Sequence, residues 1–220
     1  MMKTILRFIL CTVMGAAVGF MLLGPDMALA AKADPSFFRS KEIRSSNLKP
    51  FKKWTGALGR YVKERAKQKG SCKATKLNKC HYAAWVKFLT SIKGKDKLTQ
   101  IRLVNKYMNQ AKYTTDKTNW GRKDFWATPG EFMSKFGDCE DYAISKFLSL
   151  RMLGFKQSEL RVVAVKDLNL KVGHAILVVY YGGKVLVLDN QIKKVIDAAR
   201  VRHYSPVFSI NDKYWWRHRT

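Results

Sequence analysis

The sequence predicts an α+β fold in which helices come first and an antiparallel sheet follows. Between residues 58 and 153, several segments place apolar residues at three- and four-residue spacing, which is the period of an amphipathic helix. From Leu160 the pattern changes to apolar, β-branched runs, and Gly182-Gly183 links two of these runs as a tight hairpin. Since 47% of the 220 residues are hydrophobic, the chain can bury a substantial core. We therefore expect N-terminal helices packed on a domain in which a helix lies against an antiparallel sheet.

The order of elements follows from the same patterns. Residues 31–50 show no sustained period and read as an irregular lead-in, while 113–131 is polar and aromatic with Gly and Pro, typical of an ordered surface loop. An aromatic tail over 200–220 is expected to dock on the sheet. Helices are expected over 58–69, 81–92, 96–108 and 138–153, and strands over 160–167, 174–181 and 184–190.

The first thirty residues have the pattern of a secretory signal peptide. Lys3 and Arg7 precede an apolar run over 8–23, and Ala28-Leu29-Ala30 supplies small residues at the two cleavage positions. The run is short for an uncleaved anchor, so cleavage after Ala30 is expected. The mature chain should then lack a transmembrane helix. We divide it into a basic helical region over 31–112 and a core over 113–220, expected to form one compact unit.

The chain is strongly basic, with a formal net charge of +26, and the excess is concentrated between residues 41 and 100. In a cytosolic protein this charge would suggest nucleic acid, but an exported protein meets little of it. The charge instead favours acidic proteins, anionic lipid headgroups or polyanionic envelope polymers. A solvated basic face that serves solubility explains the individual lysines equally well.

Three cysteines remain after the expected cleavage, and an odd number leaves one thiol unpaired in an oxidising compartment. Cys72 and Cys80 flank a lysine-rich polar segment that a local disulfide would close. The alternative is a metal-binding pair at Cys72 and Cys80 with His81 adjacent, but no second pair of ligands lies nearby in the sequence. The disulfide reading leaves Cys139 free.

Cys139 lies in an acidic stretch, GDCEDYAISKF, at the head of a predicted helix. Asp138, Glu140 and Asp141 surround the thiol, although such carboxylates raise a thiol pKa and oppose the thiolate that a helix N-terminus favours. Two explanations remain open. Asp138 and Asp141 could cap the helix, or the carboxylates could bind a hard cation, most plausibly Ca²⁺. Spacing alone favours capping.

A base for the thiol follows from the register of the hairpin. If Gly182 and Gly183 form the loop, His174 and Asp189 become diagonal neighbours on one face of the sheet, roughly 7 to 8 Å apart and within reach of a hydrogen bond between their side chains. A register shifted by one residue would place them on opposite faces. Separately, His174 could be a core histidine and Asp189 a turn residue. Together with Cys139 they predict a triad of nucleophile, base and orienting carboxylate.

These motifs resemble a known family. GDCEDYAISKFLSLRMLG, GHAILVV and VLDNQ, with DFWATPGEF before them and SINDKYWW after, are similar to the bacterial transglutaminase-like cysteine proteinases, and more narrowly to the LapG-type periplasmic proteases. The resemblance runs from about residue 105 to 216. It implies a papain-like, transglutaminase-type fold and the triad named above. It also implies calcium ligands at Asp138, Glu140 and Asp141, with others from residues 116–120, which reverses the preference for capping.

The resemblance further implies a periplasmic endopeptidase that cleaves the N-terminal region of a large surface adhesin and so controls biofilm attachment. An inner-membrane cyclic di-GMP receptor would sequester it. The Cys139 backbone N–H would hold the oxyanion with one further donor, for which the indole N–H of Trp120 or Trp126 is a candidate beside a packing role. The alternatives are a transglutaminase or amidase that uses the same triad, and a non-catalytic basic envelope binding protein.

Overall fold

The structure is a computed structural model that describes residues 37–67 and 81–219. The described elements belong to one compact unit. The expected signal peptide and the Cys72–Cys80 pair lie outside the described residues. Within those residues, no helix is long and apolar enough to cross a membrane.

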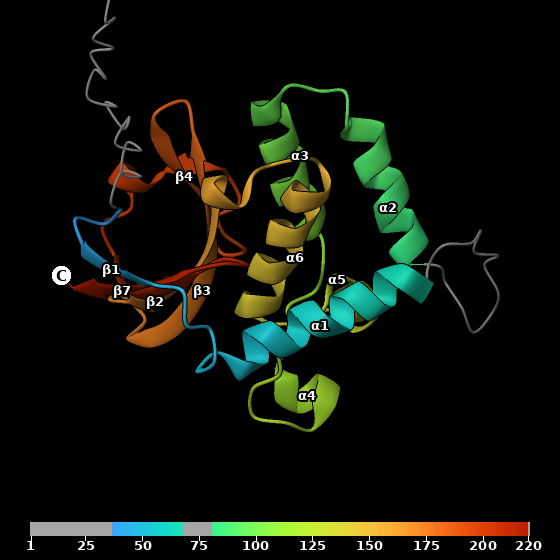
Figure 1. The fold of residues 1–220 in the computed structure, drawn as a ribbon, viewed down its shortest axis with the longest axis horizontal. Coiled ribbons are helices and arrows are strands. Elements are labelled where there is room, and N and C mark those ends of the chain that lie inside the picture. Colours follow the sequence, from blue (N-terminus) through green and yellow to red (C-terminus); the bar gives the residue numbers. More distant parts are fainter. Residues whose placement is uncertain (1–36, 68–80, 220) are drawn as a thin grey trace, which may run out of the picture. The chain divides into compact units, whose positions relative to one another are not determined.

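All four predicted helices are present, with differences at their ends (Figure 1). The helix predicted over 81–92 has these bounds in the structure, and Asp96 caps the next helix by accepting the Thr99 N–H at 2.9 Å. The first helix begins earlier than predicted. The α-helices are α1 (Lys52–Lys67), α2 (His81–Ile92), α3 (Lys97–Met108), α4 (Asp116–Trp120), α5 (Pro129–Lys135) and α6 (Cys139–Met152).

The segment predicted as a loop over 113–131 contains the short helix α4 and the start of α5. Thr128 accepts the Glu131 N–H at 3.2 Å, and the Glu131 carboxylate accepts the Thr128 N–H at 2.7 Å, so the two residues form a capping box at the start of α5. Pro129 occupies the first position of this helix. The T-x-x-E pattern that signals such a start is present in the sequence.

The strands form one antiparallel sheet in the order β1-β7-β6-β2-β3-β4-β5. The predicted hairpin register is confirmed, because Tyr181 pairs with Lys184 and Leu177 with Leu188. The strands are β1 (Lys41–Ser45), β2 (Leu160–Asp167), β3 (Val172–Tyr181), β4 (Lys184–Leu188), β5 (Ile196–Asp197), β6 (Tyr204–Ile210) and β7 (Trp215–Arg219). Two short 3₁₀ helices lie at Gln157–Glu159 and Ala198–Arg200.

Two predictions about the sheet were wrong. The lead-in over 31–50 contains β1, which pairs with β7 at the far end of the chain. The aromatic tail does not merely dock on the sheet, because β6 and β7 are two of its strands. β1 shows no buried face that a period-two pattern could have revealed. Its pairing partner, rather than its own sequence, therefore decides its structure.

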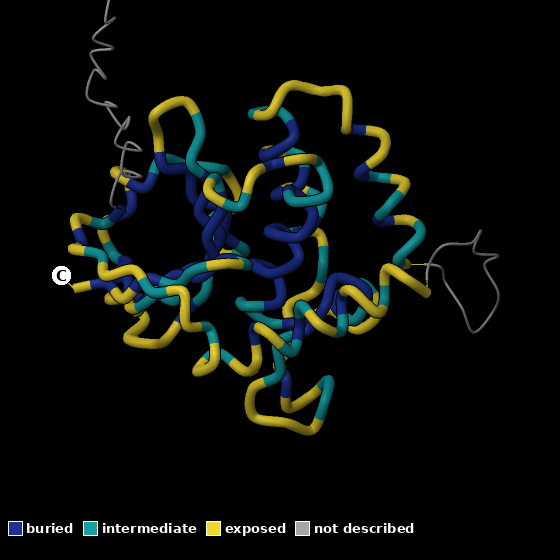
Figure 2. Tube along the Cα trace, in the orientation of Figure 1, coloured by how far each residue is buried: buried dark blue, intermediate teal, exposed yellow. Residues whose placement is uncertain are grey.

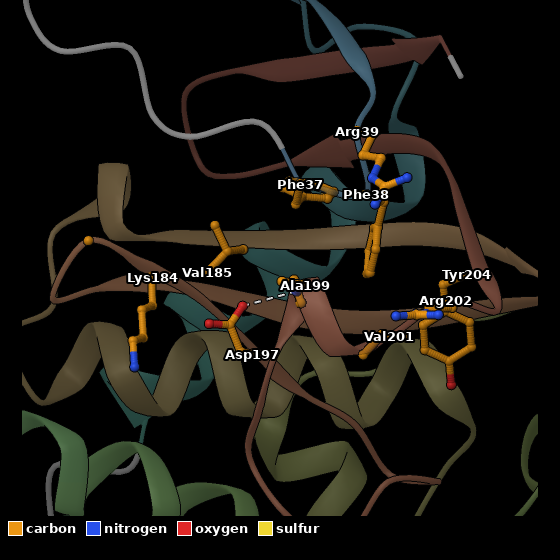
Figure 3. Close-up of a pocket in the computed structure, with 12 residues that line it drawn as sticks. Phe37, Phe38, Arg39, Lys184, Val185, Asp197, Ala199, Val201, Arg202 and Tyr204 are labelled. Atoms are coloured by element: carbon orange, nitrogen blue, oxygen red, sulfur yellow. Dashed lines mark hydrogen bonds between the residues drawn. The ribbon is translucent and has the colours of Figure 1, made fainter.

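The sheet separates two apolar layers. α6 lies beside β3, and the larger core fills the space between the helices and one face of the sheet (Figure 1). Residues 141–150 of α6 are buried, including the polar residues Ser145, Lys146 and Ser149 (Figure 2). The opposite face carries a second cluster with a pocket of about 600 Å³, whose lining includes Phe38, Val201 and Tyr204 (Figure 3).

Candidate active site

Cys139 occupies the first position of α6, directly after Gly137 and the N-cap residue Asp138. The backbone N–H of Ala175, the residue of β3 that follows His174, acts to lower the pKa of this thiol, so the sulfur lies close to β3. The thiol donates its own hydrogen to Glu140 Oε2 at 3.1 Å. At this position the Cys139 backbone N–H has no intrahelical acceptor. The sulfur therefore lies between β3, the strand of His174, and the carboxylate of Glu140.

His174 and Asp189 form the buried side of the site. His174 Nε2 and Asp189 Oδ1 lie 2.9 Å apart, and the two residues are 4% and 0% exposed. Burial opposes ionisation of Asp189, but the hydrogen bond and positive charge of His174, with further donors, lower the pKa of its carboxyl. This contact engages Nε2 and fixes the orientation of the imidazole, so Nδ1 is the ring nitrogen that Asp189 does not contact. Nδ1 lies 3.5 Å from Gln191 Nε2.

Two groups that the sequence analysis missed complete the surroundings of Asp189. The Tyr204 hydroxyl donates to Asp189 Oδ2 at 2.7 Å, and the Gln191 N–H donates to Oδ1 at 2.9 Å. Asp189 therefore accepts three hydrogen bonds, which hold it in one orientation. Tyr204 starts β6, so no local pattern around Asp189 could have identified it.

The other side of Cys139 is a cluster of three carboxylates. Asp116, at the start of α4, joins Asp138 and Glu140, and each offers an oxygen within 4.8 Å of the others. Burial first, and then repulsion from Glu140, raise the pKa of Asp138 to about 8. Asp116 Oδ1 and Asp138 Oδ1 are buried and find no hydrogen-bond partner among the described residues. Crowded carboxylate oxygens, two of them buried without a donor, are the composition of a site for a hard cation.

Asp141, predicted as a ligand, lies outside this cluster. Its Oδ1 accepts the Ala127 N–H at 2.7 Å and its Oδ2 accepts the Asp138 N–H at 3.4 Å. Its carboxylate packs against Gly137 so closely that an added Cβ there would lie 2.1 Å from Oδ2. Burial raises its pKa to about 9. The structure thus combines the two explanations left open above: Asp141 caps the helix and ties down the preceding loop, while Asp138 and Glu140 join Asp116.

The surroundings of the thiol oppose its ionisation. Burial raises the pKa of Cys139 far above its usual value, and the negative charges of Glu140 and Asp138 raise it further. A thiol held in this state is a poor nucleophile. The carboxylates therefore add to burial in keeping Cys139 a neutral thiol.

The two tryptophans considered as oxyanion donors take part in packing. Trp120 lies against Phe125 with ring centroids 4.5 Å apart, and its indole N–H is buried without a partner among the described residues. Trp126 packs edge-to-face on Trp54 of α1. Its carbonyl accepts a hydrogen bond from Arg60 at 2.6 Å. Arg60 of α1 also forms an ion pair with Glu131, so α1 helps to hold in place the segment that precedes Cys139.

The comparisons with known proteins agree with this architecture. A family model described as bacterial transglutaminase-like cysteine proteinase matches residues 53–217. Calcium-bound LapG of Legionella pneumophila has 29% sequence identity and a TM-score of 0.59, and the match covers 73% of this chain and 87% of that one. EGTA-treated LapG gives 29% identity and a TM-score of 0.60 over 74% and 87% of the two chains. No curated protein matches the sequence significantly. The predicted fold is confirmed.

Proposed function

Because the chain belongs to the bacterial transglutaminase-like cysteine proteinases, we propose that it is a calcium-dependent cysteine endopeptidase of the periplasm. The observation that carries this proposal is the arrangement around β3. The Cys139 sulfur lies against Ala175, while the preceding residue, His174, is oriented by a 2.9 Å contact with Asp189. A nucleophile, a base and an orienting carboxylate are the groups that acyl transfer through a thiol requires.

The proposed reaction proceeds through an acyl-enzyme. His174 takes the thiol proton, and the thiolate of Cys139 attacks the peptide carbonyl carbon. His174 returns the proton to the leaving amine as the C–N bond breaks, and water then hydrolyses the thioester in the same manner. Asp189 stays ionised and stabilises the imidazolium. The free N–H of Cys139 at the head of α6 is suited to hold the oxyanion.

Asp116, Asp138 and Glu140 are the residues that would hold Ca²⁺. Their unpartnered buried oxygens and the raised pKa of Asp138 fit a cation, and the Legionella relative is known in a calcium-bound form. A bound Ca²⁺ supplies positive charge that offsets the carboxylates raising the thiol pKa. Glu140, once committed to the cation site, would no longer accept the thiol hydrogen. The thiol would then be free to pass its proton to His174.

The resemblance to LapG-type proteases supports a specific biological role. The substrate would be the N-terminal region of a large surface adhesin, whose cleavage controls biofilm attachment, and an inner-membrane cyclic di-GMP receptor would sequester the protease. The net charge of +26 favours an acidic partner for either interaction. The signal-peptide pattern in residues 1–30 supports export to the periplasm.

An adhesin-fragment cleavage assay tests the proposal. Wild-type protein should cleave the fragment, Cys139→Ala should not, and EGTA should stop cleavage until Ca²⁺, but not Mg²⁺, is added back. Undiminished cleavage by Cys139→Ala would overturn the enzyme assignment. Cleavage that survives EGTA would remove the calcium requirement while leaving the triad intact. A parallel reaction with an added primary amine distinguishes hydrolysis from amide transfer, because only transfer yields an amine-linked product.

A further inference from the structure

The turn between β2 and β3 exposes a group of apolar side chains. Leu168, Leu170 and Val172 are 49%, 60% and 50% exposed, and they are three of the eight large hydrophobic residues that are exposed in the described part of the chain. They lie in the β2–β3 tip, which we define as residues 166–173. Single exposed hydrophobic residues are normal on a protein surface, but three within one short turn call for an explanation.

Hydrogen bonds hold the backbone of the β2–β3 tip in one conformation. Asp167 is 2% exposed, and its Oδ1 accepts the Asn169 N–H at 2.8 Å and the Leu170 N–H at 2.9 Å. The Leu168 N–H donates to the His203 carbonyl at 2.8 Å, which ties the tip to the segment before β6. Because this backbone is already ordered, binding through the tip costs little conformational entropy.

Basic side chains flank these apolar residues. Lys166 and Lys171 belong to the tip, and Arg202 precedes His203, the residue whose carbonyl the tip contacts. All three basic side chains are exposed, and none of them forms an ion pair within the described residues. Asp167 is the only acidic residue of the tip, and it is buried and accepts backbone N–H groups. The tip therefore presents apolar groups together with unpaired positive charge.

This combination fits an anionic lipid surface better than a protein partner. Lysine is depleted in protein–protein interfaces. Near an anionic membrane, each lysine strengthens binding about fivefold, and its aliphatic stem covers apolar surface while the ammonium reaches the phosphates. Leucine side chains enter the boundary between the headgroups and the acyl chains. The net charge of +26 adds attraction at longer range.

We propose that the β2–β3 tip docks the protein on an anionic phospholipid surface, with its leucines among the headgroups and its lysines on the lipid phosphates. Only Val172 and Gly173 lie between the turn and His174, so the tip is at the active-site end of β3. Docking therefore holds the site of Cys139 close to the membrane. The interaction does not depend on protease activity, so binding is measured without cleavage.

Co-sedimentation with vesicles tests the proposal. In about 0.15 M salt, the wild-type protein should bind vesicles of phosphatidylglycerol and phosphatidylcholine in equal parts, and should bind pure phosphatidylcholine vesicles much more weakly. Leu168→Ser combined with Leu170→Ser should weaken binding to the anionic vesicles on the order of tenfold. Lys166→Gln combined with Lys171→Gln should weaken it by a similar factor or more. Equal binding by the wild type and the leucine variant would overturn the proposal, because net charge alone would then explain the binding.

Val62→Ser is the matched control. Val62 is 65% exposed on the basic helix α1, outside the tip, so this variant should bind the anionic vesicles as the wild type does. All of these substitutions change exposed side chains, so Tm should stay close to the wild-type value. If the leucine variant bound vesicles normally but no longer cleaved the adhesin fragment, the tip would dock a protein and the lipid assignment would be wrong. Failure of the wild type to cleave would count against the protease function and leave the vesicle result standing.

Discussion

The two sides of Cys139 differ in how completely their polar groups are satisfied. On the sheet side, Asp189 accepts hydrogen bonds from Tyr204 and Gln191 and contacts His174, and its carboxyl pKa is lowered. On the acidic side, Asp116 and Asp138 keep buried oxygens without partners among the described residues, and the pKa of Asp138 is raised. On the sheet side both oxygens of Asp189 have partners, whereas the acidic side keeps unpartnered oxygens that a cation or a proton would neutralise.

This difference suggests that the His174–Asp189 pair keeps one geometry, whereas the charge of the carboxylate cluster can change. The His174–Asp189 pair is held by buried hydrogen bonds, so its geometry does not depend on a ligand. The carboxylates beside the thiol raise its pKa beyond the effect of burial, so a change in their charge would change the pKa of Cys139. Substitutions on the sheet side should therefore lower the rate of cleavage, whereas substitutions on the acidic side should raise the Ca²⁺ concentration that the reaction requires.

The largest effect is expected on the sheet side. Asp189→Asn preserves the shape of the side chain but removes the charge that stabilises the imidazolium, so kcat should fall on the order of 10³-fold or more with little change in KM. Steady-state cleavage at saturating Ca²⁺ measures this loss, and the concentration of Ca²⁺ for half-maximal activity should stay at the wild-type value. A loss below tenfold would show that Asp189 is not the orienting carboxylate.

A smaller and different effect is expected on the acidic side. Asp116→Asn removes one anionic oxygen donor, so the Ca²⁺ concentration for half-maximal activity should rise on the order of tenfold, while excess Ca²⁺ restores most of the rate. Asp141→Asn is the matched comparison, because the Asp141 oxygens accept the N–H groups of Ala127 and Asp138. It should shift the calcium requirement much less. Equal shifts in the two variants would return Asp141 to the ligand set.

The same contrast explains which parts of the site the sequence could predict. His174 and Asp189 lie on one hairpin, where Gly182 and Gly183 determine the register locally. Tyr204 reaches Asp189 from β6, whose pairing with β2 contains an irregularity between Ala164 and Val165 that no sequence pattern marks.

The acidic cluster shows a second limit. The upstream region of Asp116 was implicated by the family resemblance, but its contact with Glu140 depends on the packing of α4. Asp138 and Asp141 are both acidic residues at the start of one helix, and capping and ion binding attract the same residue type there. Only the tertiary contacts show that the Asp138 carboxylate lies with Asp116 and Glu140, whereas the Asp141 oxygens accept the N–H groups of Ala127 and Asp138.

The smallest effect is a pH dependence of the stabilisation by calcium. Without a cation, the raised pKa of Asp138, about 8, means that the folded protein keeps a proton that the unfolded chain loses above about pH 4. This contribution to stability is present below the unfolded pKa and is lost as pH rises through the folded pKa. Calcium must displace that proton, so its gain in Tm over EGTA should be small at pH 5 and grow toward pH 8.

Measuring the gain at each pH removes the contributions of shifted groups that lie outside the acidic stretch. Lys146 and His218 titrate in both the calcium and the EGTA samples, so their contributions cancel in the difference. Each kcal/mol of added stability should raise Tm by about 2–4 °C for a chain of this size. Asp138→Asn should flatten the pH dependence of the gain. Equal gains for the wild type at pH 5 and pH 8 would mean that calcium binds without displacing this proton, and that the two sides of Cys139 differ less in electrostatics than their hydrogen bonding indicates.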